Sequence, residues 1–247
     1  MNGKMNNPQS THSIEQAAAS LFDAKAGSWA EKYDTSLSPR LSVFREATLR
    51  FVPAAGRVID FGCGAGVIAL ALAHSGYQVK GLDISADMIA AAKSRAEQSK
   101  LSVDFTVGDT QTFASLDSDF DAVVSSSVLE YLPDPVQALV EMARRLRPGG
   151  HIILSVPNSQ SITRIFERIV RLPSPLARVL PLPKKITRYI QYLILSRNHF
   201  SGSRFRAICQ TAQLRVVEHQ YLLRERTFSG LAARLRSPMH FFVLKRS

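Results

Sequence analysis

Short apolar runs alternate with segments of helical periodicity through the middle of the chain. The runs are rich in Val, Ile, Leu and Phe, as buried strands are. The runs that predict strands are residues 57–62, 78–84, 103–109, 120–127 and 151–158, and the segments between them that predict helices are 66–76, 85–99 and 134–150. Strands that alternate with helices favour a parallel sheet covered on both faces, so we predict an α/β fold.

The segments on either side of this region extend the pattern. Residues 13–33 have a helix-forming composition, and residues 39–52 place apolar side chains at roughly helical spacing before Pro53. Residues 1–13 are polar and are expected to be disordered. Toward the C-terminus, one further helix and two further strands are predicted at residues 203–213, 215–223 and 239–247.

The charge of the chain is divided unevenly along its length. Residues 1–158 carry 14 Lys and Arg against 17 Asp and Glu, whereas residues 159–247 carry 17 against 3. Any surface that attracts anions is therefore expected in the C-terminal third. A solvated basic face is the simpler interpretation of the same charge.

Cysteine usage and hydropathy indicate the compartment. Cys63 and Cys209 fall into no metal-ligand or disulfide spacing, which favours a reducing environment. No apolar run approaches the roughly 18 residues that span a bilayer, and the first residues lack the apolar core of a signal peptide. We therefore expect a cytoplasmic protein, in which Cys63 is a small packing residue rather than a nucleophile.

The stretch VIDFGCGAG joins a predicted strand to the helix after it. Its glycines Gly62, Gly64 and Gly66 let the backbone turn sharply and approach a ligand closely, and the N-terminus of the next helix favours negative charge. A dinucleotide fingerprint requires Gly-x-Gly-x-x-Gly, whereas the sixth position counted from Gly62 is Val67. Asp60, just before the loop, would repel a pyrophosphate but would suit a ligand with an ammonium group.

Together with GLDIS and VGDTQTF further along the chain, this loop resembles the class I S-adenosylmethionine-dependent methyltransferases. The resemblance, strongest over residues 55–157, implies an enzyme that uses S-adenosylmethionine. It also implies a Rossmann-like sheet of seven strands with helices on both faces, whose last, antiparallel strand is residues 239–247. The chain then divides into N-terminal lid helices at 14–53, a cofactor-binding core at 54–158, a substrate-covering insertion at 159–200 and the C-terminal part of the sheet at 201–247.

The resemblance also assigns roles to residues around the cofactor. Asp60 and the three glycines would hold the methionine part, and Asp83 would accept both ribose hydroxyls, for which two carboxylate oxygens are apt. The other residues that it places there are Ile84 and Met88 against the adenine, Asp109 with Thr110 and Gln111 at the adenine amino group, Ser125 and Ser126 at the end of the fourth strand, and Tyr33 with Trp29 on a lid. Core packing is an equally good interpretation for Met88, Trp29 and Tyr33.

The stretch SSSVLEYLPDP resembles small-molecule enzymes such as the ubiquinone-biosynthesis O-methyltransferases. Where some of those have acidic and histidine residues that could hold a divalent metal, this chain has Ser127, Glu130 and Tyr131. One carboxylate with a serine and a tyrosine is a poor magnesium site, so we predict no metal. A hydroxyl acceptor benefits from a base, for which His199, Tyr131 and Glu130 are the candidates. A surface or capping role is the alternative for His199.

Residues 159–200 form a basic, proline-containing segment between the fifth strand and the next helix. Two stretches in it place apolar stripes opposite basic residues: Ile162, Ile165, Phe166 and Ile169 opposite Arg164, Arg168 and Arg171, and Ile186, Ile190, Leu193 and Ile194 opposite Lys184, Lys185 and Arg188. Because ligands bind at the carboxyl edge of such sheets, we expect a helical insertion whose inner stripes cover the substrate. Two basic amphipathic helices also match peripheral contact with an anionic membrane.

Three classes of function compete. The one that we favour is methyl transfer, by in-line displacement, to a small lipophilic acceptor, foremost at a hydroxyl oxygen. A nucleic-acid methyltransferase would use the basic C-terminal third, but the fourth strand lacks an Asn-Pro-Pro-Tyr-like motif and aromatic residues do not interleave with the basic ones. A dehydrogenase-like or noncatalytic cofactor-binding protein is disfavoured by the missing third glycine of the dinucleotide fingerprint.

Overall fold

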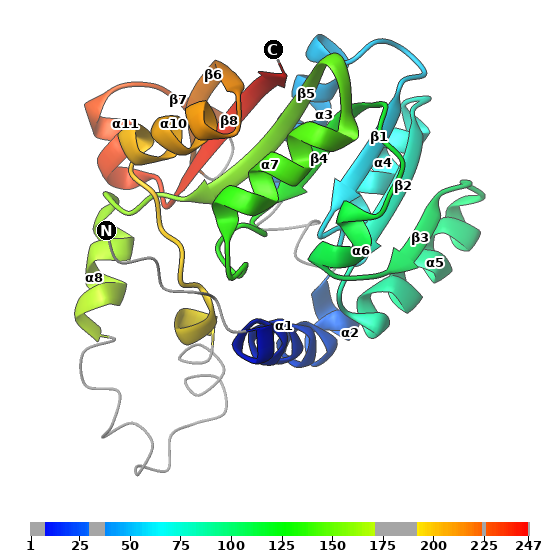
Figure 1. Ribbon diagram of the computed structural model, residues 1–247, viewed down its shortest axis with the longest axis horizontal. Helices are drawn as coiled ribbons and strands as arrows, with labels where there is room; N and C mark the ends of the chain where they lie inside the picture. Colours follow the sequence, from blue (N-terminus) through cyan, green and yellow to red (C-terminus); the bar gives the residue numbers. More distant parts are fainter. Residues whose placement is uncertain (1–7, 30–37, 171–191, 224–225, 247) are drawn as a thin grey trace.

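The computed structural model describes residues 8–29, 38–170, 192–223 and 226–246, and its centre is a mixed β-sheet (Figure 1). The strands are β1 (Arg57–Phe61), β2 (Gln78–Asp83), β3 (Asp104–Val107), β4 (Phe120–Ser126), β5 (Leu146–Pro157), β6 (Leu214–Leu223), β7 (Arg226–Phe228) and β8 (Met239–Arg246). Their order in the sheet is β3-β2-β1-β4-β5-β8-β6-β7. The strands β1 to β5 pair in parallel, and β8 runs antiparallel between β5 and β6.

This sheet confirms the predicted α/β fold, with the antiparallel strand at the expected place in the sequence. One strand was not predicted: β7 has three residues and pairs with the last residues of β6. The strand β5 also begins at Leu146, five residues before the predicted start at residue 151, and its pairing with β4 is irregular between Phe120 and Ala122. The glycines at 149 and 150 thus lie inside a strand that bends, rather than in a loop after a helix.

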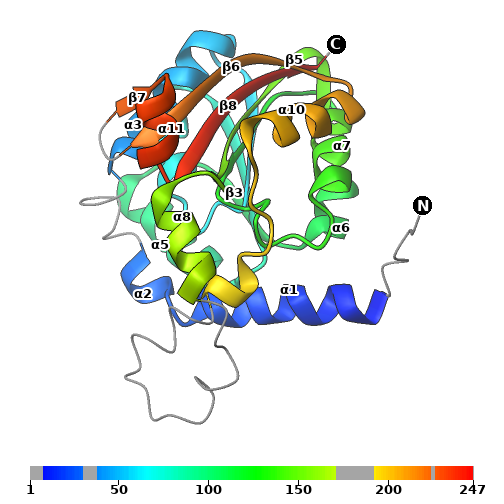
Figure 2. The same ribbon diagram turned by 90° about the vertical axis from the view of Figure 1, so that its left-hand side faces the viewer.

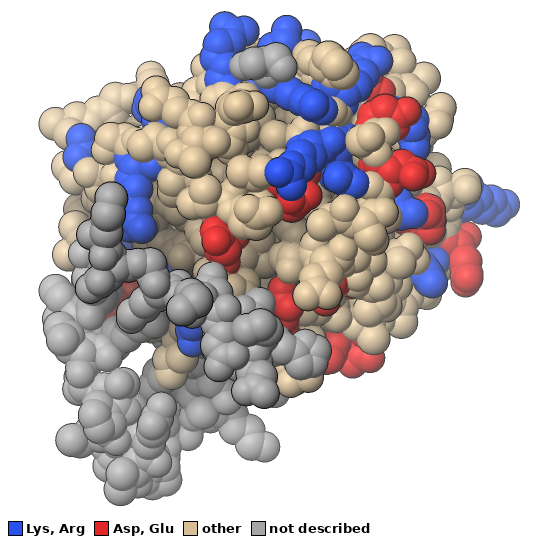
Figure 3. All heavy atoms as spheres, viewed as in Figure 1, with Lys and Arg blue, Asp and Glu red and all other residues tan. Residues whose placement is uncertain are grey.

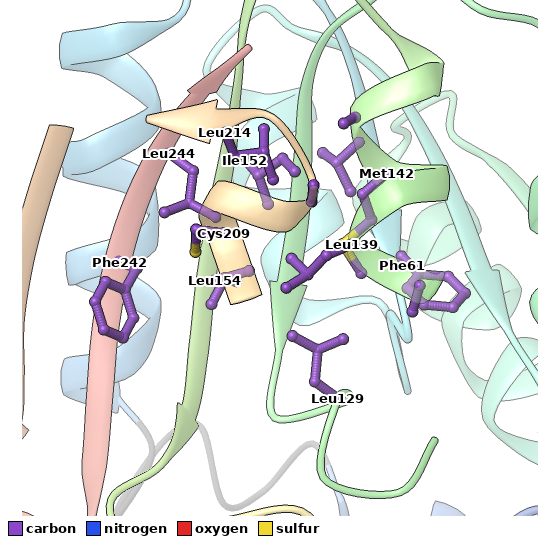
Figure 4. Packing of buried hydrophobic residues seen from close by; sticks show 14 of the residues in the cluster. Phe61, Leu129, Leu139, Met142, Ile152, Leu154, Cys209, Leu214, Phe242 and Leu244 are labelled. Carbon is purple, nitrogen blue, oxygen red and sulfur yellow. The ribbon is translucent and has the colours of Figure 1, made fainter. Parts of the chain in front are cut away.

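Helices cover both faces of the sheet (Figure 1). On one face lie α3 (Ser38–Phe51), α4 (Val67–His74) and α5 (Ala86–Ser99), and on the other lie α6 (Thr110–Ala114), α7 (Pro135–Arg145) and α10 (Gly202–Thr211). Each layer has its own apolar core. Figure 4 shows the second core, in which Leu139 and Met142 of α7 and Cys209 of α10 pack with Leu154 of β5 and Phe242 of β8. Burial of both sheet faces explains the near-continuous apolar strands.

Two helices at the N-terminus cross the end of the sheet at which the parallel strands finish (Figures 1 and 2). These are α1 (Pro8–Asp23), which packs against α5, and α2 (Ala26–Trp29). Residues 8–13 were expected to be disordered, but they form the first turns of α1. The proline at position 8 suits a helix start because it lacks the N–H that the first turn leaves unpaired. The remaining expected tail, residues 1–7, lies outside the described residues.

Two histidines connect α10 to the antiparallel strands through a directed chain of hydrogen bonds. Arg206 Nη2 lies 3.0 Å from Nδ1 of His219 on β6, and Nε2 of His219 lies 2.9 Å from Nδ1 of His240 on β8. The chain ends on the carbonyl of Phe200, 3.1 Å from Nε2 of His240. Because a guanidinium only donates, His219 must accept at Nδ1 and donate at Nε2, and His240 does the same. Both imidazoles are therefore neutral in the folded protein.

We predict that these two histidines make folding less stable at mildly acidic pH. Burial, reinforced by the neighbouring His240 for His219, lowers the pKa of both rings to about 4. The unfolded chain then binds more protons than the folded one between about pH 6.5 and 4, so stability falls as pH falls through that window. Denaturant unfolding should show a loss on the order of 2 kcal/mol, after allowance for solvent around His219.

The matched comparison is the double variant His219→Gln, His240→Gln, which keeps polar side chains at both positions but removes the two groups that titrate. This variant should be less stable than the parent protein at pH 7 and should approach it at pH 4. A constant difference across that range would show that the two rings do not titrate as the geometry indicates.

Candidate active site

A cavity of about 430 Å³ opens at the carboxyl ends of β1, β2 and β4. Its floor is the loop after β1, and α1, α2 and α8 (Ile162–Val170) supply its other walls. Carboxylates gather at this floor because successive strands end there with acidic residues. The side chains that line the cavity include Asp60, Asp83, Ile84, Met88, Asp109, Thr110, Ser126, Glu130 and Tyr131. Sequence reasoning therefore placed most of the predicted residues around one space.

Asp60 presents a buried carboxylate near the end of β1. Its side chain is almost fully buried, and among the described residues neither carboxylate oxygen has a hydrogen-bond partner. Burial, with the nearby charge of Asp83, raises the pKa of Asp60 to about 7. An unpaired buried carboxylate is costly unless a cation reaches it. The site therefore fits a ligand that brings an ammonium group.

The glycine loop comes close to the cavity in a conformation that other residues avoid. Gly62, Gly64 and Gly66 have φ angles of 78°, 52° and 76°, in the left-handed region. A Cβ at Gly62 would lie 2.2 Å from a methyl carbon of Val128, and one at Gly64 would lie 3.0 Å from Nε1 of Trp29. The loop backbone is therefore exposed to a ligand only because these positions carry no side chain.

Asp83 fixes this loop while it also lines the cavity. Its Oδ2 accepts from the backbone N–H of Gly64 at 2.7 Å, and its Oδ1 accepts from that of Ser85 at 2.9 Å. Each carboxylate oxygen has a further lone pair, so the side chain can still accept from two hydroxyls. Burial raises the pKa of Asp83, and the two backbone hydrogen bonds oppose that shift. The predicted role at a ribose diol is compatible with this geometry.

Asp109 combines a helix cap with a place in the cavity wall. Its Oδ1 accepts from the backbone N–H groups of Gln111 and Thr112, at 3.0 and 2.8 Å, and so caps α6. Desolvation raises the pKa of Asp109, but these hydrogen bonds outweigh it and lower the pKa overall. Thr110 Oγ1 donates to Glu15 of α1 at 2.8 Å, which holds the N-terminal helix over the cavity.

Four predicted residues that the structure describes do not line the cavity: Gly66, Gln111, Ser125 and His199. Ser125 is buried inside β4 and donates to the carbonyl of Phe61 at 3.1 Å, so its neighbour Ser126 is the serine that lines the space. His199 belongs to a separate depression of about 340 Å³ with Arg197 and Arg204, and it shares a hydrogen bond with Ser196. The predicted places of Ser125 at the cofactor and of His199 at the acceptor are therefore wrong. Tyr33, a further assignment, lies outside the described residues.

Sequence reasoning missed Arg40, a cavity residue on α3. Its Nη1 donates to Ser127 Oγ at 3.1 Å, and among the described residues its buried Nε has no acceptor. A guanidinium that presents free donors to a cavity fits a carboxylate. No motif could have found Arg40, because it lies 20 residues before Asp60 and in a different element.

The helix α8 presents the face opposite to the one we predicted. Its apolar residues Ile162, Ile165 and Phe166 are exposed, Phe166 by 66%, whereas Arg164 is 5% exposed and lines the cavity. Arg164 finds acceptors inside, donating to Glu167 Oε2 at 2.8 Å and to the Tyr192 hydroxyl at 3.3 Å. These partners offset part of the cost of burying the charge, although the buried Nε of Arg164 has no hydrogen-bond partner among the described residues. The side chains of residues 168–191, which include Ile169 of the first predicted stripe and Ile186 and Ile190 of the second, are not described, whereas Leu193 of the second stripe is buried as predicted.

Aromatic side chains form the wall beside Glu130. Phe22 of α1 contacts Tyr131 edge to face with ring centroids 5.3 Å apart, and Tyr131 contacts Tyr192 at 6.2 Å. Leu132, Pro238 and Met239 complete the apolar part of the lining. Glu130 itself is almost fully buried, and burial raises its pKa against the opposing charge of Arg164. The wall fits a flat, apolar ligand group that lies next to the Glu130 carboxyl group.

A metal site does not assemble from the residues that the structure describes. Across those residues, no three His, Cys, Asp or Glu side chains lie together in a way that could hold an ion.

Comparison with known proteins identifies the domain around this cavity. Residues 59–154 match the family described as "Methyltransferase domain". Over 159 residues the chain is 33% identical to a ubiquinone biosynthesis O-methyltransferase of Xanthomonas campestris pv. campestris, an alignment that covers 62% of this chain and 66% of that protein. It is 34% identical over 111 residues to the protein of the same name from Alkalilimnicola ehrlichii, covering 44% and 45%. The chain thus spans less than two thirds of these relatives.

Solved structures share the whole fold at lower identity. A magnesium protoporphyrin IX methyltransferase from Synechocystis, with bound SAH, aligns with a TM-score of 0.67 at 16% identity and covers 94% of this chain and 100% of that one. An S-adenosylmethionine-dependent methyltransferase from Clostridium acetobutylicum aligns with a TM-score of 0.64 at 10% identity, covering 90% and 98%. At such identities the likeness concerns the fold.

Proposed function

The chain contains a methyltransferase domain and has the fold of the S-adenosylmethionine-dependent methyltransferases, and on this premise we propose that it methylates a hydroxyl oxygen of a small lipophilic acceptor. The observation that carries the proposal is the cavity itself. It combines an unpaired buried carboxylate at Asp60, a second buried carboxylate at Glu130, and an aromatic wall between α1 and β4.

The cavity residues fit S-adenosylmethionine group by group. Asp60, whose buried carboxylate oxygens have no hydrogen-bond partner among the described residues, would hold the ammonium group, and the half-buried Arg40 would hold the carboxylate. Asp83 would accept from the ribose hydroxyls, and the remaining residues around the adenine would be Ile84, Met88, Asp109 and Thr110. The sulfonium of this cofactor supplies an activated methyl group. The protein's task is then to position the acceptor in line and to exclude water, which is worth about 7–11 kcal/mol in favourable cases.

The acceptor would lie against the aromatic wall with its hydroxyl toward Glu130. The Glu130 carboxylate would take the proton of the acceptor hydroxyl as that oxygen gains the methyl group that the cofactor would supply. Tyr131 is a poor base at neutral pH, because burial and the neighbouring Glu130 raise its pKa well above the ordinary value. The lining by Phe22, Leu132 and Met239 supports an apolar, ring-bearing acceptor.

A panel of acceptors tests this proposal. The protein is incubated with S-adenosylmethionine and with alkyl-substituted phenols, catechols, carboxylic acids and sugars, and the products are analysed by mass spectrometry for a gain of one CH₂. We expect methylation of phenolic hydroxyls that carry alkyl chains. Failure of calorimetry to detect S-adenosylhomocysteine binding would contradict the cofactor, whereas methylation of nitrogen or carbon alone would contradict the oxygen chemistry.

The basic residues that the structure describes on the antiparallel side of the sheet do not support a nucleic-acid acceptor. On the face of the molecule that Figure 3 shows, Lys and Arg gather at the upper end, over the start of β5 and the end of β8. Arg215 and Lys245 are paired there across β6 and β8, and Arg147 lies at the start of β5. This end of the sheet is opposite to the carboxyl ends of β1, β2 and β4, where the cavity opens. Polyanion binding at that end would not bring a base to the site.

The outward apolar residues of α8 support peripheral contact with an anionic membrane as the source of a lipophilic acceptor. The helix α11 (Leu231–Arg236) packs beside α8 and adds exposed Leu231 and Leu235, with Arg234 and Arg236 on the same helix. Apolar side chains flanked by basic ones bind anionic lipid surfaces. None of the helices that the structure describes is long and apolar enough to cross a bilayer.

We predict that the double variant Ile162→Ser, Phe166→Ser binds vesicles of anionic phospholipid about tenfold more weakly than the parent protein, because each apolar side chain contributes through burial. Cosedimentation at low salt measures the binding. Leu49→Ser on α3 is the matched control, since Leu49 is also an exposed apolar residue but lies on another helix. Absence of vesicle binding by the parent protein at low salt would contradict the membrane contact.

A further inference from the structure

Resting on the proposed function, we propose that Arg164 and Tyr192 are positioning residues that orient Glu130 and keep it ionised, so that it can take the proton of the acceptor hydroxyl. Arg164 belongs to α8, and Tyr192 begins the helical residues 192–195. Both follow β5, in the segment whose place in the sequence indicates a substrate-covering role. The segment would then contribute to the reaction as well as to the cover.

The hydrogen bonds from Arg164 to Glu130 have only one possible direction. Arg164 Nη2 donates to the Tyr192 hydroxyl at 3.3 Å, because a guanidinium has no acceptor. The hydroxyl therefore turns its own hydrogen to Glu130 Oε1, 3.4 Å away. This leaves Oε2, which has no hydrogen-bond partner among the described residues, as the oxygen that can accept from a substrate. The chain of donors thus selects which carboxylate oxygen acts.

Two opposing effects set the pKa of Glu130: burial favours the protonated form, and nearby charges and hydroxyls favour the ionised form. Burial raises its pKa, and the groups that oppose this are Arg164 from α8, Arg40 from α3, and the hydroxyls of Tyr131 and Tyr192. Arg164 comes first among the opposing groups. Arg164 acts on Glu130 through the Tyr192 hydroxyl, which lies between them, and its positive charge lowers the pKa of the carboxyl. Loss of Arg164 would therefore raise the pKa of Glu130 further and make the side chain a less available base.

Burial of Arg164 is difficult to explain as packing alone. Its ion pair with Glu167, three residues later on α8, could form equally well on the solvent side of the helix, where neither charge would be desolvated. Instead the helix exposes Phe166 and turns Arg164 inward, into contact with Tyr192 and with Met239 Sδ at 3.9 Å. The inward position lets the guanidinium donate to the Tyr192 hydroxyl, which in turn donates to Glu130, and this contact offsets part of the cost of desolvation.

Titration of Glu130 tests the proposal without a known acceptor. The full-length protein is labelled with ¹³C at glutamate carboxyl carbons, and the Glu130 resonance is assigned by its absence in Glu130→Gln. We expect Arg164→Met to raise the Glu130 midpoint by about one unit or more, and Tyr192→Phe to raise it by less. Arg144→Met, which removes an arginine from the exposed side of α7, is the matched control and should leave the midpoint unchanged.

Affinity for S-adenosylhomocysteine separates this proposal from the function on which it rests. Absence of binding by the parent protein would overturn the proposed function. Binding by every variant, with a Glu130 midpoint that does not move in Arg164→Met, would overturn the positioning role alone. Should Arg164→Met fail to fold, Tyr192→Phe decides, because it removes one hydroxyl and leaves the guanidinium in place. With an acceptor in hand, the acidic limb of kcat/KM should move in the same direction as the midpoint.

Discussion

Replacement of Asp60 by asparagine is expected to weaken the binding of S-adenosylhomocysteine by roughly 10- to 100-fold while it stabilises the free protein. The two effects have one cause. Asp60 is buried without a partner among the described residues, so its charge is a cost until an ammonium group reaches it. A hydrogen bond to a charged group contributes about 1.5–3 kcal/mol, and asparagine retains the shape but not the charge.

The pH dependence of this site has a definite sign. Because the folded pKa of Asp60 is raised to about 7 from an ordinary value of 3.8, the folded protein binds more protons than the unfolded chain between those values. Stability of the free protein therefore falls as pH rises from about 4 to 7. Binding of the ammonium group requires the ionised form of Asp60, so the affinity for S-adenosylhomocysteine should rise with pH up to about 7. Below that pH, binding should release a proton from Asp60. Asp60→Asn should remove both dependences.

Calorimetry in two buffers with different ionisation enthalpies measures the released proton, and thermal unfolding measures the stability. Asp104→Asn is the matched control, since Asp104 is a mostly exposed carboxylate on β3 that pairs with Lys80. That variant should bind S-adenosylhomocysteine as the parent does. An Asp60→Asn protein with undiminished affinity would show that the ammonium group lies elsewhere.

The sequence predicts the parts of this site that are local in the chain. The alternation of strands and helices follows from burial of both sheet faces, and it can be found because each strand is one apolar run. The loop of Gly62, Gly64 and Gly66 is recognisable for a similar reason, since three left-handed positions within five residues require glycine. Asp60 is found from its place just before this loop, whereas the resemblance to the methyltransferases assigns Asp83 and Asp109 to the cofactor at the ends of the next two predicted strands.

The parts that were missed depend on contacts between distant segments. Arg40 reaches Ser127 from another element, and the buried Arg164 donates to Tyr192, which lies 28 residues further along the chain. Periodicity alone assigns the apolar stripe of α8 to the interior, and no local signal says that a charged pair will take its place. In the same way His199 was one of three candidate bases, although the structure places it in a different depression from Glu130 and Tyr131.

Glu130→Gln is expected to lower kcat by about 100- to 10,000-fold while S-adenosylhomocysteine binding stays unchanged, because the amide keeps the size of the side chain but cannot take a proton. In the parent protein, activity should fall as pH falls through the raised pKa of Glu130, since only the carboxylate is a base. That acidic limb should disappear from the residual activity of the variant.

Tyr131→Phe distinguishes the two candidate bases that share the cavity. Its hydroxyl is buried beside Glu130, and a phenol whose pKa is raised well above its ordinary value stays protonated at neutral pH. Loss of that hydroxyl should therefore cost far less in kcat than loss of the Glu130 carboxylate, and it should move the acidic limb upward, because one group that favours the ionised form of Glu130 is removed. Equal losses in the two variants would contradict a single base. A larger loss in Tyr131→Phe would assign the proton transfer to the tyrosine.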